Sequence, residues 1–217
     1  MSSAIAGAAA DGSVAVGGRK APADKYDERR RALGDSALRT LGELGYARAS
    51  LREIANNSEF SHGVVHYYFE DKHDLIVYCV REYKSVCVRR YDGVIADSTT
   101  PEELVGGFAD KLIETLRDEA AMHRLWYDVR TQSMFDDRLR AVAVEIDGWL
   151  EEMVGRVVGR YAELAGTVPA LPASVLYGIV DGLFQQALLG VTQGREGVLE
   201  ELHALVHALL PTMVTPA

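Results

Sequence analysis

Proline, the residue that most strongly interrupts helices, is almost absent from the first half of this 217-residue chain. The six prolines are Pro22, Pro101, Pro169, Pro172, Pro211 and Pro216. No stretch between them shows sustained alternation of apolar and polar residues with hairpin turns. Apolar residues instead recur at spacings of three and four, so the sequence predicts an all-α protein of about nine helices.

The helix boundaries are predicted by caps and breaks. Gly45 follows the first apolar stripe, and Ser50, Ser61, Asp71 and Thr100 each precede another such stripe as N-caps. The expected helices cover residues 24–44, 71–95, 101–120, 122–133, 136–165, 172–192 and 195–210, with two short helices between 50 and 69.

Charge and composition divide the chain into three parts. Residues 1–23 are rich in Ala, Gly and Ser, and we expect a disordered tail whose Arg19 and Lys20 are either passive or touch a phosphate backbone. Residues 24–70 are expected to form a small helical head and residues 71–217 a larger body. Residues 1–72 carry ten basic and ten acidic residues, so the net charge of −9 comes from the thirteen basic and twenty-two acidic residues of 73–217. A neutral head can still bind DNA if its basic groups share one face.

The cellular compartment follows from what the sequence lacks. No apolar run reaches the 18 to 20 residues that cross a bilayer, and the N-terminus has no compact apolar core of a signal peptide. Cys79 and Cys87 lie about 12 Å apart along one expected helix, too far for a disulfide. We expect small buried hydrophobes at both positions, in a cytoplasmic protein without a membrane partner.

The stretch SEFSHGVVHYYFEDK, residues 58–72, contains two histidines, His62 and His66, one helical turn apart. The pair has three interpretations: it forms part of a metal site, it belongs to ordinary core or surface, or it lies on a surface that contacts another molecule. A metal would need further ligands, and only Glu59, Glu70 and His73 lie near in the sequence. Because no metal motif completes the pair, we expect no metal and favour a contact surface.

Two short helices joined by a turn and preceded by a longer helix form a helix-turn-helix pattern. The second short helix would enter the major groove with its N-terminus first. By position, the residues expected to contact DNA there are Ser61, His62, Gly63 and Val64. Ser50, Arg52 and Lys72 begin neighbouring helices and are placed for phosphates. Val65, Tyr68 and Phe69 are expected to turn inward as core.

The stretch ASLREIANNSEFSHGVVHYYFEDKHDL resembles the DNA-binding head of the tetracycline-repressor (TetR) family of bacterial transcription regulators. The resemblance rests on Ser50, Ile54-Ala55, Ser61, Tyr67-Tyr68-Phe69, Lys72 and Leu75, and covers about residues 30–80. It implies DNA contacts from Ser50, His66, Tyr67 and Lys72. Two positions depart from the pattern: Glu59 replaces the usual turn glycine, and His66 replaces a tyrosine that contacts phosphate in the family.

The body contains an unusual mixture of aromatic and polar residues, which is typical of either a ligand pocket or ordinary core and surface. The residues expected to bind a ligand are Tyr83, Cys87, Phe108, Trp126, Tyr127, Arg130, Phe135, Trp149 and Asp181. Arg130 suits an anionic or carbonyl-bearing ligand, and Trp126 and Phe135 suit ring stacking. Asp181 is either a satisfied buried carboxylate or a second polar group of the pocket.

Function follows from these parts together. The resemblance implies a homodimer through the last two helices, about 172–210, that binds double-stranded DNA at a near-palindromic operator. We expect a sequence-specific transcription regulator, a repressor released by a small-molecule effector in the body, with the helix from residue 71 carrying the signal. No catalytic motif is complete, so we expect neither an enzyme nor a cofactor.

Overall fold

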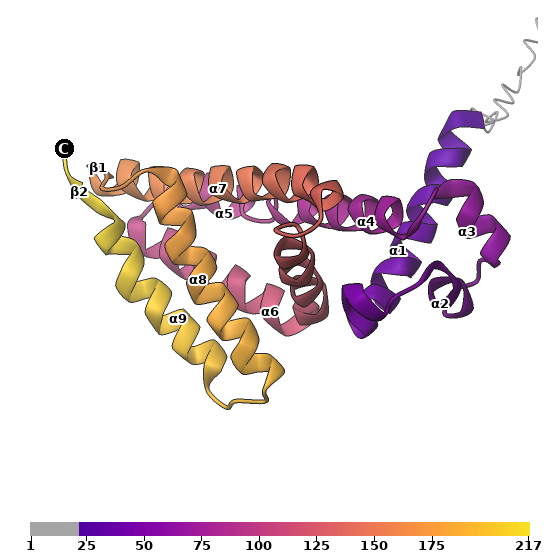
Figure 1. Ribbon diagram of the computed structural model, residues 1–217. Helices are drawn as coiled ribbons and strands as arrows, with labels where there is room; N and C mark the ends of the chain where they lie inside the picture. The colour runs from indigo at the N-terminus through magenta and orange to yellow at the C-terminus, as the bar shows by residue number, and fades with distance from the viewer. Residues whose placement is uncertain (1–21) are drawn as a thin grey trace, which may run out of the picture.

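The computed structural model describes residues 22–217, which are almost entirely helical (Figure 1). The elements are α1 Pro22–Arg48, α2 Leu51–Asn56, α3 His62–Tyr68, α4 Lys72–Cys87, α5 Asp92–Asp97, α6 Pro101–Gln132, α7 Asp137–Ala165, β1 Thr167–Pro169, α8 Ala173–Thr192, α9 Val198–Leu209, a 3₁₀ helix Leu210–Met213 and β2 Val214–Pro216. The expected all-α class is confirmed. The expected tail lies outside the described residues, except that Pro22 and Ala23 open α1.

The head consists of α1, α2 and α3 at one end of the molecule (Figure 1). Its core is built from apolar side chains that exclude solvent almost completely: Leu33, Ala37, Leu41, Ile54, Val65 and Phe69. Gly45 has a positive φ of 76°, a conformation that glycine adopts without steric cost, and α1 bends there before ending at Arg48. Tyr68, expected inward, is half-buried.

The expected caps fix the helix-turn-helix locally. Ser50 Oγ accepts a hydrogen bond from the backbone N–H of Glu53 at 3.2 Å, and Ser61 Oγ accepts one from Val64 at 3.4 Å. In the turn between α2 and α3, Ser58 Oγ accepts from the backbone N–H of Phe60 at 3.2 Å. These bonds satisfy backbone donors that a short helix leaves open, so they hold two very short helices in place.

The expected continuous helix over 71–95 is interrupted at residues 88–91. α4 ends at Cys87, and the chain passes through tight turns with i to i−3 hydrogen bonds before α5 begins. The turns bring Tyr91 into the body core, with its ring 5.3 Å from that of Phe108, and point Arg90 toward Glu119.

The two helices expected over 101–120 and 122–133 are one helix, α6, with a kink at Glu119 (φ −132°, ψ 23°). Thr100 caps its start in a reciprocal capping box with Glu103, and Pro101 occupies the first turn, as expected. The kink coincides with the carboxylate that Arg90 binds through both terminal nitrogens, at 2.6 and 2.7 Å.

The body packs α6, α7, α8 and α9 around a second apolar core. Figure 1 shows α4 running from the head into the body beside α7, while α8 and α9 form an antiparallel pair away from the head. Two three-residue strands, which the sequence did not indicate, pair antiparallel with Val168 opposite Thr215. They tie the end of α7 to the C-terminus.

One helix qualifies the expectation about membranes. By length and composition α8 is apolar enough to cross a bilayer, alone among the helices of residues 22–217. It carries Asp181 near its centre, and part of it packs inside the body. Core helices of globular proteins pass the same test, so this finding is weak evidence for a membrane.

Candidate functional site

The outer face of α3 is open. His62, Gly63 and His66 are exposed, and Tyr67 is 71% exposed, while Val65 and Phe69 on the opposite face are buried. A Cβ built on Gly63 would meet no atom within 4 Å, so no part of residues 22–217 covers the start of this helix. A helix that is anchored on one face and free on the other can lie in a DNA major groove.

The remaining expected DNA contacts differ in exposure. Ser61 and Arg52 are exposed, whereas Ser50 is half-buried because its hydroxyl also donates to Glu53 Oε2 at 2.9 Å. Val64 is half-buried against the head core, which leaves little of it for a thymine methyl. Lys72 folds back so that its ammonium lies 4.5 Å from the centre of the Tyr46 ring, and burial lowers its pKa.

Residues of α1 support this surface, and the sequence analysis did not single them out. The Tyr26 ring packs 6.1 Å from that of Tyr67 and 4.8 Å from that of Tyr68. Arg29 lies over the Phe60 ring at 5.4 Å. Tyr26 therefore orients an exposed aromatic side chain of α3. Its only signal in the sequence was an aromatic residue in the polar segment at the start of the first helix.

The His62 and His66 rings touch edge-to-face, 4.4 Å apart. Among residues 22–217, the only cluster that brings three metal-ligating side chains together consists of Cys87, Glu119 and His123, so this pair has no third ligand. That cluster is also unsuited to a cation, because Arg90 already neutralises Glu119.

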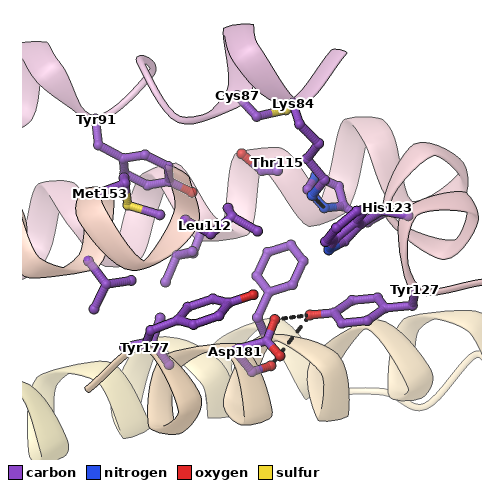
Figure 2. A pocket seen from close by; sticks show the side chains of 15 residues that line it. Lys84, Cys87, Tyr91, Leu112, Thr115, His123, Tyr127, Met153, Tyr177 and Asp181 are labelled. Atoms are coloured by element: carbon purple, nitrogen blue, oxygen red, sulfur yellow. Dashed lines mark hydrogen bonds between the residues drawn. The ribbon is translucent and has the colours of Figure 1, made fainter. Parts of the chain in front are cut away.

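The body contains a cavity between α4, α6, α7 and α8, with about 530 Å³ of empty space that is partly open to solvent. Its lining is mostly apolar or aromatic: Tyr91, Leu112, Trp126, Tyr127, Leu150, Met153, Val154, Tyr177, Val180 and Phe184, with the polar Lys84, Cys87, Thr115, His123 and Asp181. In Figure 2, Lys84 and Cys87 enter from α4 on one side, and Tyr177 and Asp181 face them from α8.

The carboxylates on the acidic wall of the cavity already have hydrogen-bond donors. Asp181 accepts a hydrogen bond from the Tyr127 hydroxyl at 2.8 Å and pairs with Arg130 at 2.7 Å (Figure 2 shows the tyrosine bond). Arg130 also pairs with Asp147 at 3.1 Å, and Asp147 accepts from the Tyr177 hydroxyl at 2.7 Å. Each carboxylate therefore has a cationic partner and a hydroxyl donor.

The opposite wall carries a buried cation that the sequence analysis missed. Lys84 is 2% exposed, and its ammonium donates to His123 Nδ1 at 3.2 Å. No carboxylate within residues 22–217 lies within 4.0 Å of it. Burial lowers the pKa of Lys84 from 10.5 to about 8. Burial and the charges of Lys84 and Arg90 hold the pKa of His123 well below 6.5, so the ring is neutral at pH 7.

Two buried N–H groups beside Lys84 have no acceptor. Because the ammonium can only donate, His123 Nδ1 carries the lone pair and Nε2 carries the proton. His123 Nε2 and Trp126 Nε1 are both buried and find no hydrogen-bond partner within the described chain. Both residues are nine-tenths or more buried and line the cavity from the same face of α6.

The structure brings together four of the nine expected pocket residues: Cys87, Trp126, Tyr127 and Asp181. The others do not line the cavity. Phe135 is 82% exposed, because it falls in the turn after α6 rather than on its inner face, and it does not line this cavity.

The other four lie around the cavity. Trp149 packs against the core shared with the head, and Phe108 packs against Tyr91 from the far side. Tyr83 donates to Glu119, and Arg130 stands behind Asp181, so both support the wall without forming it.

A helix-turn-helix head with an exposed α3, joined to a helical body with an apolar cavity, is typical of DNA-binding transcription regulators. Two family models match the chain: residues 33–79 match "Bacterial regulatory proteins, tetR family", and residues 101–212 match "BetI-type transcriptional repressor, C-terminal". The chain belongs to the TetR family of bacterial transcription regulators.

Individual relatives agree. The transcriptional regulator BetI of Cronobacter sakazakii is 28% identical over 173 residues, which is 74% of this chain and 80% of that protein. A TetR regulator from Haloarcula marismortui shares the fold with a TM-score of 0.71 and 18% identity, over 87% of this chain and all of that one. A transcriptional regulator from Saccharomonospora viridis, solved in complex with choline, has a TM-score of 0.67 and 20% identity, over 88% and 100%.

Proposed function

We propose that this protein is a cytoplasmic repressor that binds a near-palindromic operator as a homodimer and is released when a small molecule enters the body cavity. One observation carries the proposal. The same chain has an exposed α3 face at one end and, at the other, an apolar cavity with polar groups that lack hydrogen-bond partners within residues 22–217. The match of residues 101–212 to a BetI-type repressor model supports repression over activation.

The outer face of α8 supports a homodimer. Between Val175 and Leu189, which is 48% exposed, this face carries no charge and includes Gly178 and Gly182. A Cβ at either glycine would meet no atom within 4 Å, so a second helix can approach closely. On α9, Leu205 is 38% exposed. Apolar faces of two neighbouring helices favour burial against the same faces of a second copy.

A polar cluster at the junction of head and body supports coupling between the two sites. His73 Nε2 on α4 lies 2.8 Å from the Tyr46 hydroxyl of α1 and 3.0 Å from Asp136, which caps α7. The backbone N–H of Tyr46 also donates to Asp128 of α6 at 2.8 Å. A shift of α6 or α7 around a bound molecule would therefore move the end of α1 and the base of α4 together.

A mobility-shift titration with the DNA upstream of the protein's own gene tests the proposal. The expected result is a sequence-specific, salt-sensitive complex of one dimer with two half-sites about one helical turn apart. Equal affinity for unrelated DNA of the same length would contradict it.

A further inference from the structure

The unmet polar groups of the cavity indicate which kind of molecule it binds. We propose that the effector is a carboxylate on an apolar body, with the carboxylate placed against the ammonium of Lys84 and the free N–H groups of His123 and Trp126. This inference rests on the proposed role of the cavity as the effector site.

Around Lys84, the described chain has more buried hydrogen-bond donors than acceptors. The ammonium of Lys84 has three hydrogens, and the described chain supplies one acceptor, His123 Nδ1. His123 Nε2 and Trp126 Nε1 each leave a buried hydrogen without a partner. Unpaired buried donors of this kind are rare in proteins and each is unfavourable. A carboxylate offers two oxygens with about four lone-pair positions, which is what these donors lack.

The charges around the cavity are consistent with an anion. Glu119 is held by Arg90, while Asp147 and Asp181 share Arg130 and each also accepts from a tyrosine hydroxyl. Together Arg130, Asp147 and Asp181 carry one net negative charge, and both carboxylates already have their own hydrogen-bond donors. Asp181 faces Lys84 from α8 (Figure 2). Among residues 22–217, no carboxylate lies within 4.0 Å of the Lys84 ammonium, although Asp181 and Asp147 favour its charge from farther away.

A quaternary ammonium such as choline fits this chain less well. Aromatic rings line the cavity and could face a cation, but a buried ammonium beside the Trp126 ring, 5.4 Å from its centre, already occupies that role. A second cation in the same enclosed space would be repelled by Lys84, since charges interact strongly away from water. This chain therefore differs in ligand chemistry from the choline-bound regulator that shares its fold.

The rest of the cavity suits an apolar body. Beyond the polar groups, the wall consists of Leu112, Met153, Val154, Val180 and Phe184. These side chains offer no hydrogen bonds, so a ring or a short hydrocarbon chain would gain affinity there by leaving water.

Calorimetric titration of the full-length protein at pH 7 tests the inference. The probes are benzoate, phenylacetate, 4-phenylbutyrate and octanoate, each paired with its uncharged primary amide, and choline. We expect at least one carboxylate to bind tenfold or more tightly than its own amide. In Lys84→Met and Lys84→Gln that preference should disappear while the affinity for the amide changes less than twofold. Lys111→Met, on the surface of α6, should keep it.

Three results would overturn the assignment: no carboxylate preferred over its amide, choline bound more tightly than every carboxylate, or the preference retained without Lys84. Release of operator DNA, measured in parallel, separates this inference from the proposed function. If a carboxylate binds through Lys84 but does not release DNA, the proposed release mechanism is wrong and the proposed ligand class stands. If choline releases DNA and no carboxylate binds, the proposed ligand class is wrong and the release mechanism stands.

Discussion

Replacement of Lys84 by methionine should make the unliganded protein more stable at neutral pH. Methionine has a similar length and no charge, so it fills the same space without a buried ammonium. Most substitutions of buried residues destabilise a protein. The opposite sign here follows from a cation that is 2% exposed and has no carboxylate of residues 22–217 within 4.0 Å.

The magnitude follows from the pKa of Lys84, which is 10.5 in an exposed lysine and about 8 in the folded protein. Each pKa unit corresponds to 1.36 kcal/mol, so the buried charge costs about 3 kcal/mol of folding free energy at pH 7. The variant also loses the hydrogen bond to His123, worth about 1 kcal/mol. The net gain is about 2 kcal/mol, or an increase in Tm of about 4–8 °C for a chain of this size.

The contribution of Lys84 to the free energy of unfolding of the wild type rises with pH above about pH 8. Above pH 8 the folded protein releases the Lys84 proton, while the unfolded chain keeps it until pH 10.5. The unfolded state then binds more protons, so this group makes the wild type more stable as pH rises through that window. Buried tyrosines oppose the trend at high pH, but they are common to both proteins and cancel in the difference. Buried Cys87 does not cancel, because the charge of Lys84 lowers its pKa and Lys84→Met therefore raises that pKa further. This rise makes the variant less stable at high pH, in the same direction as the loss of its advantage.

Urea denaturation of wild type, Lys84→Met and the control Lys111→Met at pH 7 and pH 9.5 measures this. Protomer concentration is held fixed, because the proposed dimer would contribute to stability. The advantage of Lys84→Met should fall by about 2 kcal/mol between the two pH values, and the control should stay within about 0.5 kcal/mol of wild type. A less stable Lys84→Met at pH 7, or an advantage independent of pH, would refute the reasoning.

Three further predictions concern the head, the dimer and their coupling. His66→Ala should weaken operator binding about fivefold per half-site, measured by fluorescence anisotropy, while circular dichroism shows a folded head. The control Glu43→Ala, on α1, should not weaken operator binding. Leu189→Glu should reduce the light-scattering mass from twice 23.7 kDa to the monomer, whereas exposed Val144→Glu on α7 should not. Tyr46→Phe should keep DNA affinity within about twofold but weaken effector-driven release about fivefold, since one hydrogen bond at the junction is lost.

The parts of the fold that the sequence predicted correctly are those set by neighbours along the chain. Ser50, Ser61, Asp71 and Thr100 each accept a hydrogen bond from the residue three positions on, so a cap and its helix are visible together in a short stretch. The end of α4 at Cys87 was missed because its causes are distant: the packing of Tyr91 on Phe108 and of Arg90 on Glu119.

The cavity residues also divide into those that neighbouring residues in the sequence indicate and those that depend on distant contacts. Trp126 and Tyr127 were found because aromatic residues cluster in the sequence, and Asp181 because it interrupts an apolar helix. Lys84 was missed because a lysine among Glu, Tyr and Ser looks like surface, although it continues the apolar stripe of Val80 and Cys87 at helical spacing. Whether a lysine on such a stripe is buried depends on which helices cover it, and the residues next to it in the sequence do not show which helices those are.

The central claim is that α3 reads a specific operator and that occupation of the body cavity releases it. Fluorescence anisotropy of the labelled upstream DNA, titrated with the wild-type protein and then with a molecule shown to bind the cavity, tests both halves at once. The account predicts tight, salt-sensitive binding that unrelated DNA does not compete away, followed by release at ligand concentrations matching the calorimetric affinity. Binding to all DNA alike, or a complex that persists with the cavity filled, would contradict it.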